Sequence, residues 1–177
     1  TVTPQSNSSH NATLSEWQHI IDATGAQSFL EVGCNAGWNL EAIRSILPDA
    51  EMTGVDLSIE ALHEAQAKGF DVEVMAGHEV SKTFAGCADL VFTCGVLIHV
   101  PPSDLLATME SIRDSSAAFV LAVEYDADAE TEIHYQGHDG LLWKRPYGRL
   151  YEGLGLSVVE TGVAQGFDRC TYWILER

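Results

Sequence analysis

The stretch Ser28–Leu40 of the chain reads SFLEVGCNAGWNL. The apolar run at its start predicts a short buried strand, and Gly33 and Gly37 predict a tight turn. Helical spacing follows over Asn39–Leu47. A strand that enters a glycine turn and then a helix presents backbone N–H groups to a ligand that can approach the main chain closely. The stretch therefore predicts a ligand-binding βα unit.

A second feature of such a unit lies about 20 residues further on, where Asp56 ends a predicted strand, Glu51–Val55. This is the position of a ribose-binding carboxylate in nucleotide-binding βαβ units. The dinucleotide fingerprint G-x-G-x-x-G is not met, because Asn35 takes the place of its second glycine and Trp38 of its third. An indole at the third position would obstruct the close packing of helix on strand. The pattern therefore disfavours NAD.

Counted from Glu31 to Gly37, the motif is E-x-G-x-x-x-G. It resembles the first motif of the class I S-adenosylmethionine (SAM) methyltransferases. The resemblance implies that the glycine loop lies against the methionine and ribose portions of SAM and that Asp56 holds the ribose hydroxyls. The alternative is an ordinary βα turn followed by a surface aspartate.

Composition and charge limit the classes of protein to which the chain can belong. With 177 residues, 46% of them hydrophobic and 20% charged, it fits one domain with a full core, taken here as residues 1–177. The formal net charge of −17 disfavours nucleic acid and anionic membranes as partners. No apolar run is long enough for a membrane helix, no signal peptide is evident, and the four scattered cysteines are typical of reduced thiols. We expect a cytoplasmic protein that acts on a small molecule; the sequence does not predict its oligomeric state.

The rest of the chain alternates between strand and helix patterns. We expect a flexible N-terminal arm over residues 1–11, or an arm that folds over the cofactor, and then a helix that begins near Thr13 or Ser15. Further strands are predicted over Asp71–Met75, Asp89–Thr93, Ala117–Glu124, Leu156–Ala164 and Cys170–Leu175, and helices over Ile59–Lys68, around Leu105–Ile112 and from Pro146 to Gly153. We expect Tyr125–Arg145 to be an irregular polar segment. The pattern predicts an α/β fold: a doubly wound, mostly parallel, seven-stranded Rossmann-like sheet of the class I methyltransferase type, with a C-terminal antiparallel hairpin.

Several segments together resemble the methyltransferases known as pseudaminic acid biosynthesis-associated methylases, a branch of the class I family. The matching segments are Leu30–Asn35 with Gly37 and Asn39–Leu40, Asp89–Thr93 with Gly95–His99, Glu124–Tyr125, and Tyr135 with Gly137–His138 and Lys144–Arg145. The resemblance covers roughly residues 28–177 and departs from the family pattern after the Lys-Arg pair and at the N-terminus. It implies SAM binding and methyl transfer, with S-adenosylhomocysteine as the product, and it says little about the acceptor.

Ligands of open α/β sheets bind outside the carboxyl ends of the strands, so the loops at this edge carry the expected cofactor-binding residues. They are Glu31, Gly33, Cys34, Asn35, Gly37, Asp56, Leu57, Gly77, His78, Cys94 and Gly95. For Asn35 the alternative is a turn residue that uses its own side chain locally. His78 and Glu79 stand where many family members have an aspartate that meets the adenine amino group.

The expected catalytic or acceptor-binding residues follow the later strands. His99 lies after the fourth strand as a general base, a substrate contact or a structural histidine that caps the next turn. Tyr125, Tyr135 and His138 lie on the long polar segment, which we expect to cover the acceptor side of the cofactor as a lid.

The same segment is rich in charge. Its carboxylates Glu124, Asp126, Asp128, Glu130 and Glu132 form either a solvated edge or a mouth that selects an amine or amino acid. No metal site is expected, because no ligand cluster has a defined spacing. Lys144 and Arg145 either pair with these carboxylates or bind an acidic group of the substrate.

We therefore predict a SAM-dependent methyltransferase that acts on a small polar molecule, for which an amine or amino acid suits the acidic segment. The alternatives are an enzyme that cyclises or cleaves the aminocarboxypropyl arm of SAM without methyl transfer, and a non-catalytic SAM-binding partner. Product analysis separates the first two, because arm chemistry releases methylthioadenosine.

Overall fold

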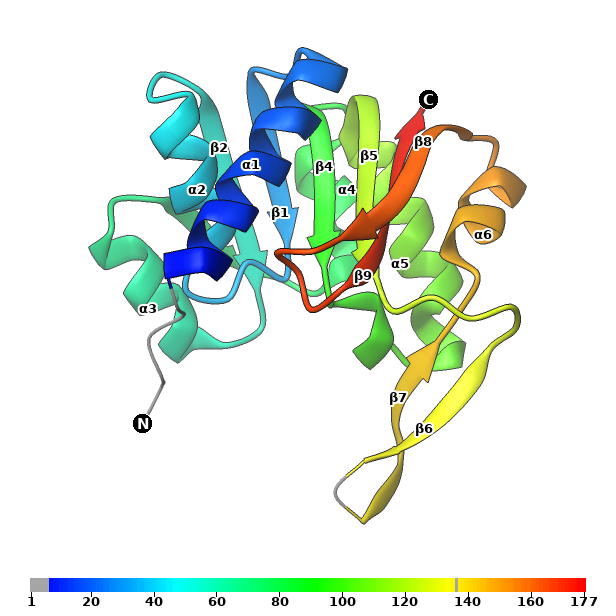
Figure 1. The fold of residues 1–177 in the computed structure, drawn as a ribbon. Helices are drawn as coiled ribbons and strands as arrows, with labels where there is room; N and C mark the ends of the chain where they lie inside the picture. Colours follow the sequence, from blue (N-terminus) through cyan, green and yellow to red (C-terminus); the bar gives the residue numbers. More distant parts are fainter. Residues whose placement is uncertain (1–6, 136) are drawn as a thin grey trace.

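The computed structural model describes residues 7–135 and 137–177 and contains a seven-stranded sheet in the order β3-β2-β1-β4-β5-β9-β8 (Figure 1). Strands β1 to β5 pair in parallel, whereas β9 and β8 run antiparallel to their neighbours and close one edge. The bounds are β1 Ser28–Val32, β2 Glu51–Asp56, β3 Asp71–Val74, β4 Ala88–Cys94, β5 Ser116–Glu124, β8 Ser157–Ala164 and β9 Cys170–Glu176. The predicted doubly wound sheet with a C-terminal hairpin is confirmed.

Helices cover both faces of this sheet (Figure 1). The strands alternate their side chains, so that Phe29 of β1 packs toward one set of helices and Leu30 toward the other. The first face is covered by α1 (Asn7–Thr24), α2 (Trp38–Ile46) and α3 (Ile59–Ala67), and the second by α4 (Val80–Phe84), α5 (Pro102–Ser115) and α6 (Tyr147–Gly153). The two apolar cores fix the register of the strands, because a slip of one residue would exchange the two faces.

Local signals set most of these boundaries where the sequence places them. Ser58 caps α3 by accepting the amide of Ala61, and Gly69 follows the helix with a positive φ of 86°. Two short 3₁₀ turns, Gly77–Glu79 and Leu97–His99, follow β3 and β4, and the sequence did not reveal them or α4. Within the described residues, no helix combines the length and the apolar character needed to cross a membrane.

The N-terminal part of the chain differs from its prediction. Helix α1 begins at Asn7, so residues 7–11 of the expected arm are helical, while residues 1–6 lie outside the described part. Thr13 and Ser15 lie inside the helix instead of capping it, and the Thr13 hydroxyl donates to the carbonyl of Gly166, 3.4 Å away. The first turns of α1 are polar, so they carry no periodic apolar signal from which its beginning could be predicted.

The segment Tyr125–Arg145 is also more regular than predicted. It contains an antiparallel hairpin of β6 (Thr131–Tyr135) and β7 (His138–Lys144), in which Tyr135 pairs with His138 beside the turn. This β6–β7 hairpin forms its own two-stranded sheet and projects below the body of the molecule in Figure 1, at the end where β1, β2 and β4 finish. Mostly exposed, mixed side chains obscured its alternation in the sequence.

Two glycines of α6 test how tightly this helix packs on the sheet. A Cβ added to Gly148 would lie 2.5 Å from Nε1 of Trp173, whereas one added to Gly153 would meet nothing within 4 Å. Gly148→Ala should therefore lower the free energy of unfolding by about 1–3 kcal/mol through overpacking. Gly153→Ala is the matched control and should leave stability unchanged or raise it slightly. Urea unfolding of both variants is the measurement; equal midpoints would contradict the observed packing.

Candidate functional site

The turn after β1 is fixed to the end of β2 by its backbone. The amides of Gly33 and Cys34 both donate to the carbonyl of Val55, at 2.7 and 3.0 Å. Gly33 has a φ of 79°, and a Cβ there would lie 2.4 Å from a methyl carbon of Val96. Gly37 has a φ of 75°, and its Cβ would lie 3.1 Å from the ring of Phe70. The two predicted glycines are thus required both by conformation and by close packing.

Asp56 ends β2 beside this turn, with its side chain half-exposed. Its Oδ2 accepts the amide of Asn35 and its Oδ1 accepts the amide of Ser58, each at 2.8 Å. A carboxylate has about four acceptor positions, so each oxygen can still accept a hydroxyl from a ligand. The Asn35 side chain is used within the loop, because its Oδ1 accepts the amide of Ala36 at 2.7 Å. This is the local use that the sequence left open as the alternative for Asn35.

Glu31 is a buried carboxyl on β1, directly behind the turn. Its Oε1 accepts a hydrogen bond from the Asn39 side chain at 2.7 Å, whereas its Oε2 is buried without a hydrogen-bond partner. Burial, and to a smaller extent the charge of Asp56, raises the pKa of Glu31 to about 8. An unsatisfied buried carboxyl oxygen is costly unless a ligand supplies a donor, and an ammonium group would also favour its charged form.

The two cysteines of the expected site, Cys34 and Cys94, have thiols with raised pKa values. The Sγ of Cys34 fills the space above Gly54, where a Cβ would lie only 2.6 Å from it. Burial raises the pKa of the Cys34 thiol to about 12 and also raises that of Cys94. Neither thiol is therefore a thiolate nucleophile at neutral pH.

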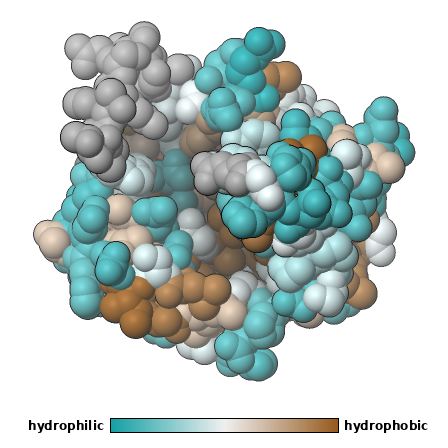
Figure 2. All heavy atoms as spheres, turned by 90° about the horizontal axis from the view of Figure 1, so that it is seen from below, coloured by the Kyte–Doolittle hydropathy of each residue, from teal (hydrophilic) through white to brown (hydrophobic). Residues whose placement is uncertain are grey.

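Apolar side chains lie beside Asp56 at the ends of β2 and β3. Leu57, Ile59 and Val74 are all more than half exposed, and Val74 is the strand partner of Asp56. Figure 2 shows this end of the molecule, where apolar surface borders a hollow. Gly77 packs against α5, since a Cβ there would lie 2.9 Å from Thr108, while His78 is exposed. Such a surface suits the face of an aromatic base.

The segment after β4 is held by two buried charged residues. The Oε1 of Glu124 accepts the amides of Val96 and Leu97, both at 3.1 Å. From the other side, Arg145 donates to the carbonyls of Leu97 and Val100, both at 2.8 Å, and pairs with Glu130 at 2.7 Å. Burial raises the pKa of Glu124 to about 7.

These contacts revise two expectations. Glu124 does not belong to a solvated edge, because its side chain is fully buried. Its place as the last residue of the apolar run FVLAVE was the signal for this burial. Of the alternatives for Arg145, the structure shows pairing with the acidic segment, which leaves a fully buried guanidinium with no face toward a substrate.

Of the four expected catalytic residues, two lie on or against the segment after β4 and two lie on the β6–β7 hairpin. His99 is exposed at the end of the 3₁₀ turn after Gly95, and the Tyr125 ring lies 3.9 Å from the position of a Cβ on Gly95. The Tyr125 hydroxyl donates to Asp168 at 2.7 Å, and this bond, together with burial, raises the pKa of Tyr125. Tyr135 and His138 lie on the projecting hairpin (Figure 1). In the described part of the chain, no group of three or more His, Cys, Asp or Glu residues is arranged to hold a metal ion.

Comparison with known proteins places this geometry in a family. A family model described as a methyltransferase domain matches residues 29–117, which include the glycine turn, Asp56 and the segment after β4. The chain therefore belongs to this methyltransferase family, and it is an enzyme that uses SAM to transfer methyl groups. A search of curated proteins found no match.

Solved structures share the fold at low sequence identity. One is the 1,6-didemethyltoxoflavin N1-methyltransferase of Burkholderia thailandensis with S-adenosylhomocysteine, at 14% identity and a TM-score of 0.73, covering 94% of this chain and 77% of that one. Another is a sugar N-methyltransferase from Streptoalloteichus, at 14% identity and a TM-score of 0.73, covering 95% and 87%. A third is the magnesium protoporphyrin IX methyltransferase of Synechocystis with bound SAM, at 16% identity and a TM-score of 0.71, covering 99% and 86%.

The residues present fit SAM. The unpartnered Glu31 Oε2 suits the ammonium group of its methionine portion, and Asp56 suits the ribose hydroxyls. The exposed apolar side chains of Leu57, Ile59 and Val74 suit the adenine ring.

Asp56→Ala should weaken SAM binding at least about tenfold, because the variant loses charge-assisted hydrogen bonds to ribose of roughly 1.5–3 kcal/mol each. Asp49→Ala, an exposed position at the opposite end of β2, is the control and should bind SAM as the wild type does. Calorimetric titration measures both, and an unchanged dissociation constant for Asp56→Ala would remove this residue from the site. NAD should not bind to either protein.

Glu31→Gln should flatten the pH dependence of stability in the absence of SAM. The folded-state pKa of Glu31, about 8, lies above its ordinary value of 4.5, so the folded state holds a proton that the unfolded state releases. Glu31 therefore makes the free energy of unfolding fall as pH rises between about 5 and 8. Glu124 has a raised pKa of about 7 and acts in the same direction, so the slope should decrease without vanishing. Urea unfolding across this range is the measurement, with the exposed Glu64→Gln as control; an unchanged slope would refute the assignment.

Proposed function

We propose that the chain transfers the methyl group of SAM to an amine nitrogen of a small polar molecule. The observation that carries this proposal is the charge around the acceptor side. Asp126, Asp128 and Glu132 are exposed there on the segment that follows β5, and the chain as a whole carries a net charge of −17. Such a field attracts a protonated amine and repels acidic acceptors. Two structural neighbours are named as N-methyltransferases, which agrees with this choice.

The residues of the chain would act mainly by holding the cofactor and the acceptor in position, without forming covalent bonds to either. SAM supplies an activated methyl group that a nucleophile can displace directly from sulfur. Asp56 and Glu31 would hold the ribose and ammonium groups, which aligns the cofactor at the edge where β4 and β5 end. The segment Gly95–Val100 would form the floor on which the acceptor rests, and Glu124 and Arg145 keep this floor rigid.

A protonated amine must lose a proton before its nitrogen can attack. His99 is exposed beside Gly95 and is the group we assign to accept this proton. Tyr125 does not suit the role of base, because its hydroxyl donates to Asp168 and its pKa is raised. We assign Tyr125 instead to the wall of the acceptor site.

The finer resemblance to pseudaminic acid biosynthesis-associated methylases is part of the proposal. Its matching segments are far apart in the sequence, and the structure supports their joint role because three of them meet. Leu97 of the Gly95–His99 segment accepts a hydrogen bond from Arg145 of the Lys144–Arg145 pair, and Glu124 of the Glu124–Tyr125 segment accepts the amide of Leu97.

Mass spectrometry of SAM incubated with the protein and a panel of small amines, alcohols and carboxylic acids tests the proposal. S-adenosylhomocysteine and a methylated amine should form together. Methylthioadenosine as the product would show chemistry on the aminocarboxypropyl arm, and methylation confined to alcohols or acids would refute the choice of acceptor. His99→Ala should lower turnover at neutral pH and regain part of it at higher pH, where the free amine is more abundant.

The β6–β7 hairpin is proposed to contact the acceptor. Tyr135→Phe or His138→Ala should therefore lower turnover far more than SAM affinity, since the cofactor contacts come from the earlier loops. His63→Ala changes an exposed histidine on α3 and serves as control. Steady-state kinetics with calorimetric SAM binding is the measurement, and wild-type turnover in both hairpin variants would exclude the hairpin from the acceptor site.

A further inference from the structure

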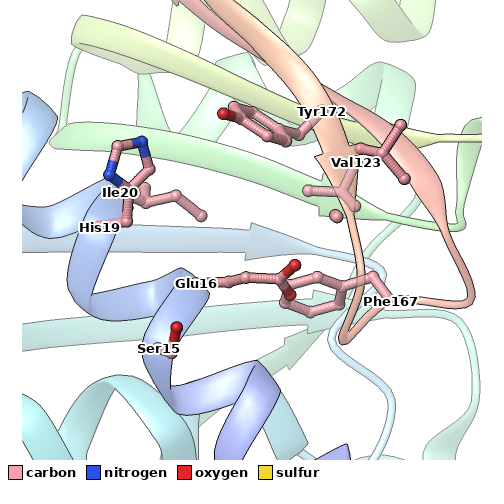
Figure 3. Close-up of a pocket in the computed structure, with 9 residues that line it drawn as sticks. Ser15, Glu16, His19, Ile20, Val123, Phe167 and Tyr172 are labelled. Carbon is pink, nitrogen blue, oxygen red and sulfur yellow. The ribbon is translucent and has the colours of Figure 1, made fainter.

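A cavity of about 360 Å³ lies between α1 and the β8–β9 hairpin, away from the glycine turn (Figure 3). Its apolar wall includes Ile20 of α1, Val123 of β5 and Phe167 of the β8–β9 turn. Figure 3 shows the carboxyl group of Glu16 and the ring of His19 on the α1 side and the Tyr172 hydroxyl opposite them. The volume falls in the range of small-molecule sites in proteins.

Two groups of polar contacts join α1 to the β8–β9 hairpin around this cavity. Within the first, Glu16 accepts the amide of Gly166 at 2.9 Å, near the turn of the hairpin. In the second, the Oε1 of Glu160 contacts Nε2 of His19 at 2.5 Å and accepts the hydroxyl of Tyr172 at 2.6 Å. Helix and hairpin are therefore held apart at a fixed spacing, and the cavity does not depend on the conformation of a single side chain.

The cavity is separate from the cofactor site. None of the residues assigned above to SAM lines it. Tyr125 lies between the two regions: its ring approaches Gly95, and its hydroxyl binds Asp168, the residue after Phe167. Phe167 in turn packs on Trp17, with ring centroids 6.1 Å apart.

We infer that this cavity is a second small-molecule site, which takes a protonated amine carried on an apolar body. Glu16 lines the cavity, Glu160 borders it and is already paired with the lining residue His19, and none of the described lining residues is a lysine or arginine. An ammonium group at the Glu16 carboxylate would leave the apolar part of the ligand against Ile20, Val123 and Phe167. Burial raises the pKa of Glu16, and a bound cation would offset this by favouring the charged carboxylate.

The test uses the full chain saturated with S-adenosylhomocysteine, so that the cofactor site is filled. The probes are phenethylamine, cyclohexylamine and tyramine. Phenethyl alcohol is the control, because it has the shape of phenethylamine without its charge. Amide NMR shifts should change at Ser15, His19 and Val163 with the amines and much less with the alcohol. Equal changes with the alcohol, or no change at these positions with any of the three amines, would overturn the inference.

Variants separate this site from the proposed acceptor site, which would also attract amines. Glu16→Gln keeps an oxygen for the Gly166 amide and should weaken amine binding at the cavity at least about tenfold, because the charge is lost. Val163→Trp, at a half-exposed lining position, should fill the cavity and abolish binding. The control Asp22→Asn, an exposed carboxylate of the same helix, should bind as the wild type does. Binding that is lost in His99→Ala and kept in Glu16→Gln would assign the amine to the acceptor site and refute a second one.

Discussion

Four backbone amides donate to the carbonyl of Val55 and the carboxylate of Asp56 at the end of β2, and they shape the candidate cofactor site. The carbonyl of Val55 accepts those of Gly33 and Cys34, and the carboxylate of Asp56 accepts those of Asn35 and Ser58. The glycine turn after β1 and the first turn of α3 are therefore both attached to one short stretch of backbone. Because these bonds form within the protein, the site has its shape before any ligand arrives, and binding does not have to order the loop.

Buried charge is concentrated at the same end of the sheet. Glu31, Glu124 and Arg145 are almost completely buried there, although charged groups are rarely buried without partners. One carboxyl oxygen of Glu124 and two guanidinium nitrogens of Arg145 bond the backbone of the segment after β4, and these bonds hold the segment in place. Glu31 and Glu124 each also have one buried carboxyl oxygen without a hydrogen-bond partner among the described residues. Glu124 and Arg145 hold the segment after β4, whereas Glu31 lies directly behind the glycine turn, where its carboxyl suits the ammonium group of SAM.

The strands of the seven-stranded sheet could be predicted from the sequence, because parallel strands that are buried on both faces consist mostly of apolar residues. The position of Asp56 followed from strand length and spacing alone. The β6–β7 hairpin was missed because an exposed two-stranded ribbon needs no apolar face, so its strands lack the alternation that marks other strands. The hydrogen bonds of Arg145 to the carbonyls of Leu97 and Val100 could not be predicted either, since they join residues that are 45 or more positions apart. A charged side chain in a polar segment gives no local sign that it will be buried.

The base of the β6–β7 hairpin has a consequence for how this enzyme can change during evolution. The amide of Arg145 donates to the carbonyl of Tyr125, and the amide of Ala127 to that of Arg145, each at 3.4 Å. The chain thus leaves the body of the protein and returns to it at one point. The pairing of the seven-stranded sheet does not involve the two strands of the hairpin between these residues. Closing a longer or shorter excursion at that point changes the free energy only slightly, because loop-closure entropy grows slowly with length. Insertion, deletion or exchange in the exposed outer part of the β6–β7 hairpin is therefore open to selection at little cost to folding, provided that Glu130 remains to pair with the buried Arg145.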